Sequence, residues 1–245
     1  MPELSAPRHV VFVRHGESEG DQRRAMGLEQ PKQSELLKHP RDEEQTALGH
    51  EQSQRAGAWI AANILDRYGV NDFAVCLTSP LTRTMQSAQS LGRYDWRPDS
   101  RLTERDRGSI QGMTSAEHQA NLPTSYEQMR AQPFDWVPDK GESMSMVAAR
   151  LTEMLGDVTH RYDTVLCMTH RDLMWATYSA LDGVTERSVG QMDTSGISNG
   201  HIFHYTNIDP ESGQIAPRLH WRQQVDPASA VESVASWQYI ENAQF

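Results

Sequence analysis

The sequence predicts an α/β fold in which a mostly parallel sheet is covered by helices on both faces. Two observations lead to this prediction. Short apolar runs typical of buried strands alternate along the chain with longer amphipathic segments typical of helices. The 245 residues also fit one large α/β domain, since no linker-like stretch divides them. We therefore expect a single domain over residues 1–245, with a polar insertion at 20–45 and a second insertion, a candidate lid, at 105–140.

The N-terminal segments supply the first strand and the first long helix. Residues 9–13 are rich in valine, which predicts a short buried strand. Residues 20–45 are polar and carry charges of both signs, so we expect a long loop or a partly helical surface insertion there. Residues 46–65 carry apolar side chains at helical spacing, and Thr46 is suited to be the N-cap of that helix.

The second strand is predicted at residues 72–78, and it ends at a Ser-Pro pair. Pro80 suits the first turn of a helix and Ser79 suits its cap, so we expect a helix from there to about Leu91. Residues 105–140 then interrupt the alternation with turn-rich sequence that contains aromatic residues. We interpret this stretch as an insertion close to the functional site.

The C-terminal half continues the alternation of strands and helices. A helix is predicted at residues 141–160, where apolar side chains form one stripe at helical spacing. A third buried strand is predicted at 163–168, followed by a helix at 173–181. Two further strand-like segments lie at 201–205 and 218–221. Strands that alternate with helices in this way form parallel sheets with both faces covered.

Composition and charge disfavour several classes of function. The formal net charge is -10 and the sequence pI is about 5.4, which argues against general binding of nucleic acid or of an anionic membrane. Arginines gathered in a cleft can still bind an anion, because the local field depends on arrangement. Cys76 and Cys167 lie in apolar runs, which predicts buried reduced thiols. Without an apolar stretch of membrane-spanning length or a signal-like N-terminus, the protein is expected to be cytoplasmic.

Side chains capable of chemistry follow the predicted strands. Arg14 and His15 come directly after the first strand, and Arg83 lies shortly after the second. Glu104 follows a turn, and His170 comes after the third strand. Since function in open α/β sheets gathers at the carboxyl ends of the strands, we expect these five residues to converge on one rim. Each of them alone has an ordinary structural explanation, and only their combination favours a site.

This set of residues suits phosphoryl transfer. Arginine forks match phosphate oxygens, and a neutral imidazole can attack phosphorus and hold the phosphoryl group covalently. A carboxyl group that stays protonated near neutral pH can protonate the departing oxygen, and a second imidazole, if cationic, adds positive charge. No metal ion or other cofactor is expected, because fixed cations take the place of a metal.

The same motifs resemble those of the histidine phosphatase superfamily, which includes cofactor-dependent phosphoglycerate mutase. The resemblance spans roughly residues 9–205. It rests on VRHGES at 13–18, SPLTR at 79–83, RLTER at 101–105, GES at 141–143 and TH at 169–170. The family's usual fold, a three-layer α/β/α sandwich, agrees with the alternation of strands and helices.

The resemblance implies a role for each residue of the set. His15 would be the nucleophile, and Arg14, Arg83 and His170 would clamp the phosphoryl group. Glu104 would donate a proton to the leaving group and later act as the base that activates water. The expected substrate is therefore a phosphorylated small molecule.

Several positions depart from the mutase pattern. Asp21 stands where an asparagine is common, and an anion there would repel phosphate unless it points away. Arg171 stands where a glycine is common, Arg107 lies near where the mutase carries an aromatic residue, and the insertion lacks a paired arginine. If Arg107 and Arg171 face the cleft, they would bind a second negative group of the substrate, and otherwise they are solvated surface charges. Ser18 would either donate to a phosphate oxygen or cap a turn.

These departures favour hydrolysis over isomerisation. We predict a metal-independent phosphatase that hydrolyses a phosphomonoester through a phosphohistidine on His15. One alternative is a phosphoglycerate mutase-type phosphoryl transferase, and another is a non-catalytic descendant that binds a phosphorylated ligand or a partner protein. Residues 226–245 would either pack on the domain or contribute to a homo-oligomer contact.

Overall fold

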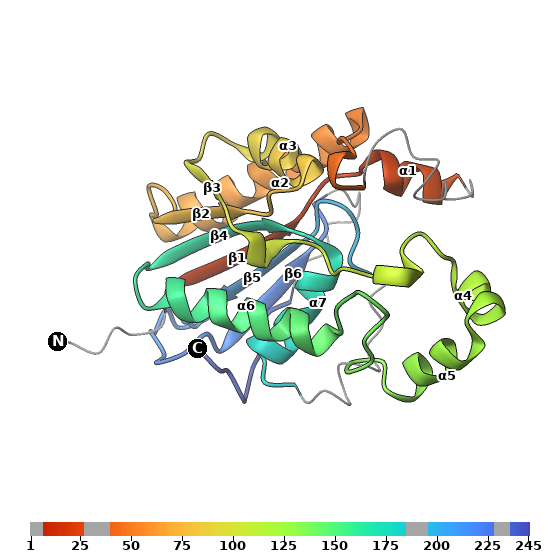
Figure 1. The fold of residues 1–245 in the computed structure, drawn as a ribbon. Helices are drawn as coiled ribbons and strands as arrows, with labels where there is room; N and C mark the ends of the chain where they lie inside the picture. Colours follow the sequence, from red (N-terminus) through yellow and green to blue (C-terminus); the bar gives the residue numbers. More distant parts are fainter. Residues whose placement is uncertain (1–6, 27–39, 185–195, 228–235) are drawn as a thin grey trace.

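The fold is built around a mixed β-sheet, seen edge-on in Figure 1. A computed structural model describes residues 7–26, 40–184, 196–227 and 236–245. Within these ranges the strands are β1 (His9–Arg14), β2 (Val75–Thr78), β3 (Trp96–Pro98), β4 (Thr164–Thr169), β5 (Ile202–Thr206), β6 (Trp221–Val225) and β7 (Gln238–Tyr239). They form a seven-stranded sheet in the order β3-β2-β4-β1-β5-β6-β7.

Helices flank this sheet. They are α1 (Glu19–Ala25), α2 (Ala47–Ile60), α3 (Thr82–Leu91), α4 (Ser115–Asn121), α5 (Pro123–Ala131), α6 (Met144–Thr159) and α7 (Arg171–Ala180). A π-helical turn, Ala61–Asp66, continues α2, and short 3-10 turns lie at Pro40–Asp42, Ser100–Leu102 and Gly108–Ile110. Among the residues that the structure describes, no helix combines the length and apolarity that a membrane crossing requires.

The parallel half of the sheet matches the prediction from the sequence. Strand β4 pairs in parallel with β1 and with β2, and β2 pairs in parallel with β3. Strands β5, β6 and β7 then extend the sheet in antiparallel pairs from β1 outward. All carboxyl ends of the parallel strands therefore lie at one edge, which is where the candidate site residues follow in the chain.

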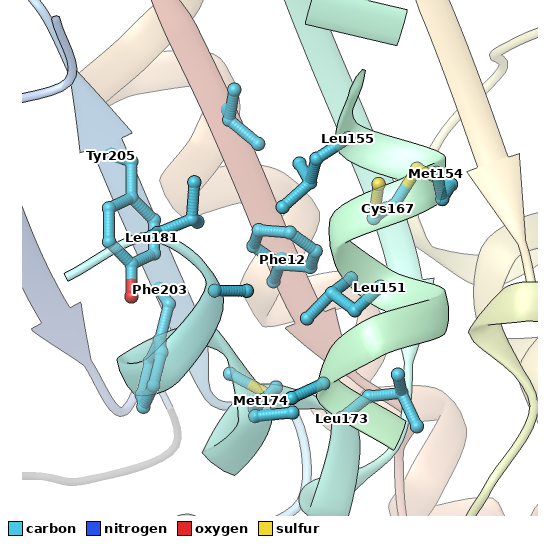
Figure 2. Packing of buried hydrophobic residues seen from close by; sticks show 14 of the residues in the cluster. Phe12, Leu151, Met154, Leu155, Cys167, Leu173, Met174, Leu181, Phe203 and Tyr205 are labelled. Atoms are coloured by element: carbon cyan, nitrogen blue, oxygen red, sulfur yellow. The ribbon is translucent and has the colours of Figure 1, made fainter. Parts of the chain in front are cut away.

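The two faces of the sheet bury different side chains of the same strands. Along β1, Val10 and Phe12 belong to the core beneath α6 and α7, whereas Val11 and Val13 belong to the core beneath α2 and α3. Figure 2 shows Phe12 in the same buried cluster as Leu151 and Leu155 of α6 and as Leu173 and Met174 of α7. This alternation follows from the two-residue period of a strand, and it produces the predicted three layers.

Several helix boundaries follow from caps visible in the sequence, and others differ from the prediction. Thr46 caps α2, because its hydroxyl accepts a hydrogen bond from the Gly49 amide at 3.1 Å. Helix α6 begins at Met144 rather than at residue 141, since the Ser143 hydroxyl is its cap. Helix α7 begins at Arg171, two residues earlier than expected, because the chain turns into the helix directly from β4.

Two predictions were wrong, namely the cap of the helix that follows β2 and the bounds of the strand that precedes the end of the chain. Ser79 does not cap a helix: α3 starts later, with Leu81 at the N-cap position. The strand expected at 218–221 begins only at Trp221. The preceding segment contacts the end of the chain instead, since the Leu219 amide donates to the Phe245 carbonyl at 2.7 Å and so withdraws this segment from the sheet.

The two predicted insertions differ in how much of them the structure describes. Residues 27–39 of the first lie outside the described residues, while its ends form α1 and a 3-10 turn. The second contains α4 and α5, which lie to the side of the sheet in Figure 1. Its role as a lid stays a prediction. Cys76 and Cys167 are buried free thiols, as expected.

We expect Gly57→Ala to destabilise the protein by about 1–3 kcal/mol, because helices α2 and α3 touch at this position. A Cβ on Gly57 would lie 1.9 Å from the Leu91 carbonyl oxygen, which is backbone and cannot swing away. Gly156→Ala in α6 is the matched control: its Cβ meets nothing within 4 Å, so a gain of up to about 1 kcal/mol is expected. Urea unfolding measures the free energy of unfolding of both variants. Equal stabilities for the two variants would contradict the close approach.

Candidate active site

His15 follows β1 and is held in one tautomer. Its Nδ1 lies 2.7 Å from the Gly16 carbonyl oxygen, which can only accept, so Nδ1 carries the hydrogen. Its Nε2 therefore carries the lone pair, and the Arg83 Nε lies 3.4 Å from it. Burial, with help from Arg83 and Arg14, lowers the pKa of His15 to about 3, although the Asp21 carboxylate opposes the shift. The imidazole is thus neutral near pH 7, as a nucleophile must be.

A Cβ at position 16 would not fit beside this ring. It would lie 2.1 Å from the Gly49 carbonyl oxygen, so the chain after β1 can pass under α2 only with a glycine. The Gly16 amide also donates to the Ser87 hydroxyl at 3.0 Å. The glycine in the motif therefore serves the close approach of two backbone segments, which fixes where the His15 ring lies.

Two arginines lie close enough to His15 to act on its charge. Arg14, at the end of β1, donates to the Ile197 carbonyl oxygen at 2.7 Å and to Asp21 at 3.3 Å. Arg83, the second residue of α3, is buried and contacts both histidines of the site. Burial is the main cause that lowers the pKa of both guanidinium groups, yet arginine stays charged in proteins. Two fixed cations therefore border the nucleophile.

His170 lies at the start of α7, with its ring 5.1 Å from the ring of His15. Its Nδ1 faces the Arg83 Nη2 at 3.4 Å and must accept, so its Nε2 donates to the Ser79 hydroxyl at 2.9 Å. Burial, and then Arg83, holds the pKa of His170 well below its usual range. The resting site therefore contains a neutral second imidazole, and a cationic form requires a bound anion.

Glu104 lies at the entrance of the site, with its side chain 27% exposed. Its Oε2 is 4.0 Å from the His170 Nδ1. Burial raises the pKa of this carboxyl and Asp172 raises it further, whereas Arg107 and Arg83 oppose the shift. Glu104 thus keeps its proton to a higher pH than an ordinary glutamate, which suits a general acid.

Arg107 and Arg171 meet at one buried carboxylate instead of standing alone. Arg107 Nη2 lies 2.9 Å from Asp172 Oδ2, and Arg171 Nε lies 3.7 Å from Asp172 Oδ1. Burial tends to raise the pKa of Asp172, but Arg107 and then Arg171 hold it low. The two arginines are therefore ion-paired beside Glu104, and their predicted contact with substrate stays a prediction.

Ser18 and Asp21 form the capping box at the start of α1. The Ser18 hydroxyl accepts from the Asp21 amide at 3.2 Å, and the Ser18 amide donates to Asp21 Oδ2 at 3.1 Å. These are the bonds of a helix cap, and donation by Ser18 to a phosphate oxygen stays a prediction. Asp21 does not point away from the site: its Oδ2 is 3.8 Å from the His15 Nδ1.

Sequence reasoning missed two residues that the fold brings to this site. Ser79 is fully buried against His170, and its position directly after β2 was the signal that could have revealed it. Asn199 donates to the His15 carbonyl oxygen at 3.1 Å and to Asp21 Oδ2 at 3.0 Å. It comes from a loop 184 residues away, and no motif marks it.

A cavity of about 1000 Å³ opens beside Glu104 and Arg83. Its wall includes cations such as Arg105 and Lys140 and anions such as Asp106 and Asp139. Among the described residues that line it, Leu81 alone carries an aliphatic side chain and none is aromatic. The space next to the expected proton donor is therefore large and lined mainly by polar and charged residues.

Known proteins are similar in sequence to most of this chain. The sequence profile of the histidine phosphatase superfamily (branch 1) matches residues 10–213. A 2,3-bisphosphoglycerate-dependent phosphoglycerate mutase of Brucella anthropi is 28% identical over 192 residues, which cover 74% of this chain and 85% of the relative.

Solved structures share the fold. A mycobacterial glucosyl-3-phosphoglycerate phosphatase in complex with VO3 has a TM-score of 0.60 and 24% identity, covering 81% of this chain and 92% of the other. A phosphoserine phosphatase of Entamoeba histolytica has a TM-score of 0.62 and 19% identity, covering 81% and 90%. At these identities the likeness extends to the fold alone.

Proposed function

Because this chain belongs to the histidine phosphatase superfamily, we propose that it is a metal-independent phosphatase that hydrolyses a phosphomonoester through a phosphohistidine on His15. The observation that carries the proposal is the tautomer of His15. Its hydrogen is held at Nδ1 by the Gly16 carbonyl, and its lone pair at Nε2 faces the cationic side of the site. A ring prepared in this way is a phosphorus nucleophile without further proton transfer.

The first step transfers the phosphoryl group to the protein. The Nε2 lone pair of His15 forms the N–P bond while the bond from phosphorus to the alcohol oxygen breaks. Arg14 and Arg83 stabilise the negative charge of the transferring group, and Glu104 gives its proton to the departing oxygen. His170 gains positive charge as the phosphate dianion binds, since a nearby anion favours its protonated form.

The second step releases phosphate. Water attacks phosphorus, and its proton passes to the Glu104 carboxylate left by the first step. The electrons of the N–P bond return to Nε2 of His15, which restores the neutral ring with its hydrogen at Nδ1. Glu104 is again protonated, so the site is ready for another cycle.

The polar cavity beside Glu104 supports a hydrophilic alcohol part of the substrate. The leaving oxygen must reach Glu104, so the rest of the alcohol occupies the space lined by Arg105, Gln111 and Lys140. The absence of aromatic side chains among the described lining residues disfavours a stacked nucleobase. A screen of phosphorylated small metabolites is the direct way to identify the substrate.

A phosphoglycerate mutase is a second candidate, and the likeness to the Brucella anthropi enzyme favours it. Incubation with 3-phosphoglycerate, with and without 2,3-bisphosphoglycerate, separates the two reactions by 31P NMR. A mutase produces 2-phosphoglycerate, whereas the proposed phosphatase produces inorganic phosphate from a phosphomonoester. A non-catalytic descendant would bind phosphorylated ligands and turn none of them over.

The proposed function is tested by phosphate release from 4-nitrophenyl phosphate in the presence of a chelator. We expect turnover by the native chain to be unchanged by the chelator, and an alkaline quench to preserve phosphate on His15 for mass spectrometry. Turnover that stops on chelation would contradict a metal-independent reaction. Phosphate trapped on another residue would contradict the assignment of the nucleophile.

The pH dependence of activity should depend on Asp172. This carboxylate raises the pKa of Glu104, and in Asp172→Asn that effect disappears while Arg107 is left without its partner and lowers the same pKa. Because a general acid acts while protonated, the alkaline limb of kcat/KM on an alkyl phosphate should move to lower pH by about one unit. Asp95→Asn, at an exposed site, is the matched control. A limb that stays in place would contradict the coupling.

A further inference from the structure

Asp21 places an anion next to the nitrogen of His15 that does not attack phosphorus. Its Oδ2 lies 3.8 Å from the His15 Nδ1, and the carboxylate is 10% exposed. On the opposite side of the ring, Nε2 faces the guanidinium of Arg83. The ring is therefore polarised, with a negative group at the end that carries hydrogen and a positive group at the end that attacks.

The Asp21 carboxylate is fixed in this position from several directions. Burial tends to raise its pKa, but His15, Arg14 and Arg24 together hold it well below the usual range, so it is ionised. Its hydrogen-bond donors are the Ser18 amide, the Ser18 hydroxyl, Arg14, Arg24 and Asn199. With this many contacts the carboxylate cannot swing toward the phosphoryl group, and its charge acts on the ring.

Resting on the proposed function, we propose that Asp21 is a positioning residue whose charge, added to the hydrogen bond of the Gly16 carbonyl, keeps the hydrogen on Nδ1 of His15 and stabilises the positive charge of the ring while phosphate is bound to Nε2. When Nε2 bonds to phosphorus, its lone pair is used and the ring becomes cationic as long as Nδ1 keeps its hydrogen. An anion at about 4 Å favours that cation.

The retained hydrogen decides how fast the phosphoenzyme breaks down. When the N–P bond breaks, its electrons go to Nε2. A ring that still carries hydrogen at Nδ1 then leaves as neutral imidazole, whereas a ring without it would have to leave as an imidazolide anion. The first is the better leaving group, so loss of the Nδ1 hydrogen slows hydrolysis. Asp21 thus extends hydrolysis of the phosphoenzyme to higher pH.

None of the other charged and titratable groups described around the His15 ring stabilises a positive charge at Nδ1 in the resting site. Arg14 and Arg83 are cations and disfavour a cationic ring, and His170 is neutral in the resting site. Glu104 carries its charge only after it has given up its proton, and it approaches the His170 side of the site. Asp21 is therefore the ionised carboxylate placed at Nδ1 among the described residues.

The test is the pH dependence of phosphoenzyme decay in Asp21→Asn. The protein is mixed with 4-nitrophenyl phosphate, excess substrate is removed by rapid desalting, and decay of phospho-His15 is followed by alkaline quench between about pH 5 and 9. The alkaline fall of the decay rate should begin about 1 pH unit lower in Asp21→Asn than in the native chain, because Arg14 and Arg24 already offset part of the carboxylate charge. The amide oxygen of asparagine can still accept from the Ser18 amide, so the helix cap is kept.

Arg24→Ala is the matched control, since it removes another partner of the same carboxylate from an exposed site. Loss of this cation strengthens the effect of the Asp21 charge on the His15 ring. The alkaline fall of the decay rate should therefore begin at the same pH as in the native chain or at a higher pH. Should Asp21→Asn fail to fold, Asp21→Ala gives the same comparison. Superimposed profiles of the native chain and the Asp21 variants, or an equal downward shift in Arg24→Ala, would overturn the inference. Absence of phospho-His15 in the native chain would overturn the proposed function, and the inference with it.

Discussion

We expect His15→Ala to lower kcat by about 10⁴-fold or more, because it removes the group that forms the covalent intermediate. The two arginines and His170 would still bind phosphate, so the variant should keep affinity for a phosphate analogue such as vanadate. Phosphate release measures the first effect, and calorimetric titration of the variant with vanadate measures the second. Together they separate loss of chemistry from loss of binding.

The control for this experiment is His160→Ala, which removes an exposed histidine at the end of α6. It should retain full activity, since its side chain lies away from the site residues. Thermal melting verifies that both variants are folded. If His15→Ala kept an appreciable fraction of native turnover, His15 would not be the phosphoryl carrier, and the whole proposed mechanism would fail.

We expect Glu104→Gln to produce an effect that depends on the substrate. With an alkyl phosphate, turnover should fall by about 10²–10⁴-fold, because the amide cannot protonate the departing alkoxide. With 4-nitrophenyl phosphate the alcohol leaves as a stable anion, so phosphorylation of His15 should change little. Hydrolysis of the phosphoenzyme would still lack its base. Rapid mixing should therefore show a burst of nitrophenolate, equal to the amount of enzyme, followed by a slow steady state.

Glu51→Gln, which changes an exposed carboxylate on α2, should behave as the native chain on both substrates. The informative quantity is the loss of turnover on the alkyl phosphate divided by the loss of turnover on 4-nitrophenyl phosphate. An equal loss on alkyl and aryl phosphates, with no burst, would show that Glu104 acts on binding or on folding and not as the proton donor.

The local parts of this molecule could be predicted from the sequence. Buried strands of valine-rich residues, the Thr46 cap and the apolar stripe of α6 depend on neighbours within a few positions, so their patterns are visible in the chain itself. The convergence of His15, Arg83 and His170 was also predictable, because parallel strands bring their carboxyl ends to one edge whatever their order.

Other features depend on partners far away in the chain. Whether a segment joins the sheet depends on which backbone groups hydrogen-bond to it. The Leu219 amide, for example, donates to the carbonyl of Phe245 at the end of the chain and not to a strand. The direction of β5 is likewise set by its pairing with β1. Ser79 has the local pattern of a helix cap, yet its hydroxyl accepts from His170 because β2 and β4 are neighbours in the sheet.

The sequence by itself determined the α/β alternation and the residue types that can carry a phosphoryl group. Only the tertiary structure decided the electrostatic state of those residues. Burial makes His15 and His170 neutral. Asp172, which raises the pKa of Glu104, comes from α7 after β4, far from Glu104 in the chain. The physical reason is that pKa values depend on burial and on the distance to other charges. Both are properties of contacts between distant segments, which composition and spacing do not contain.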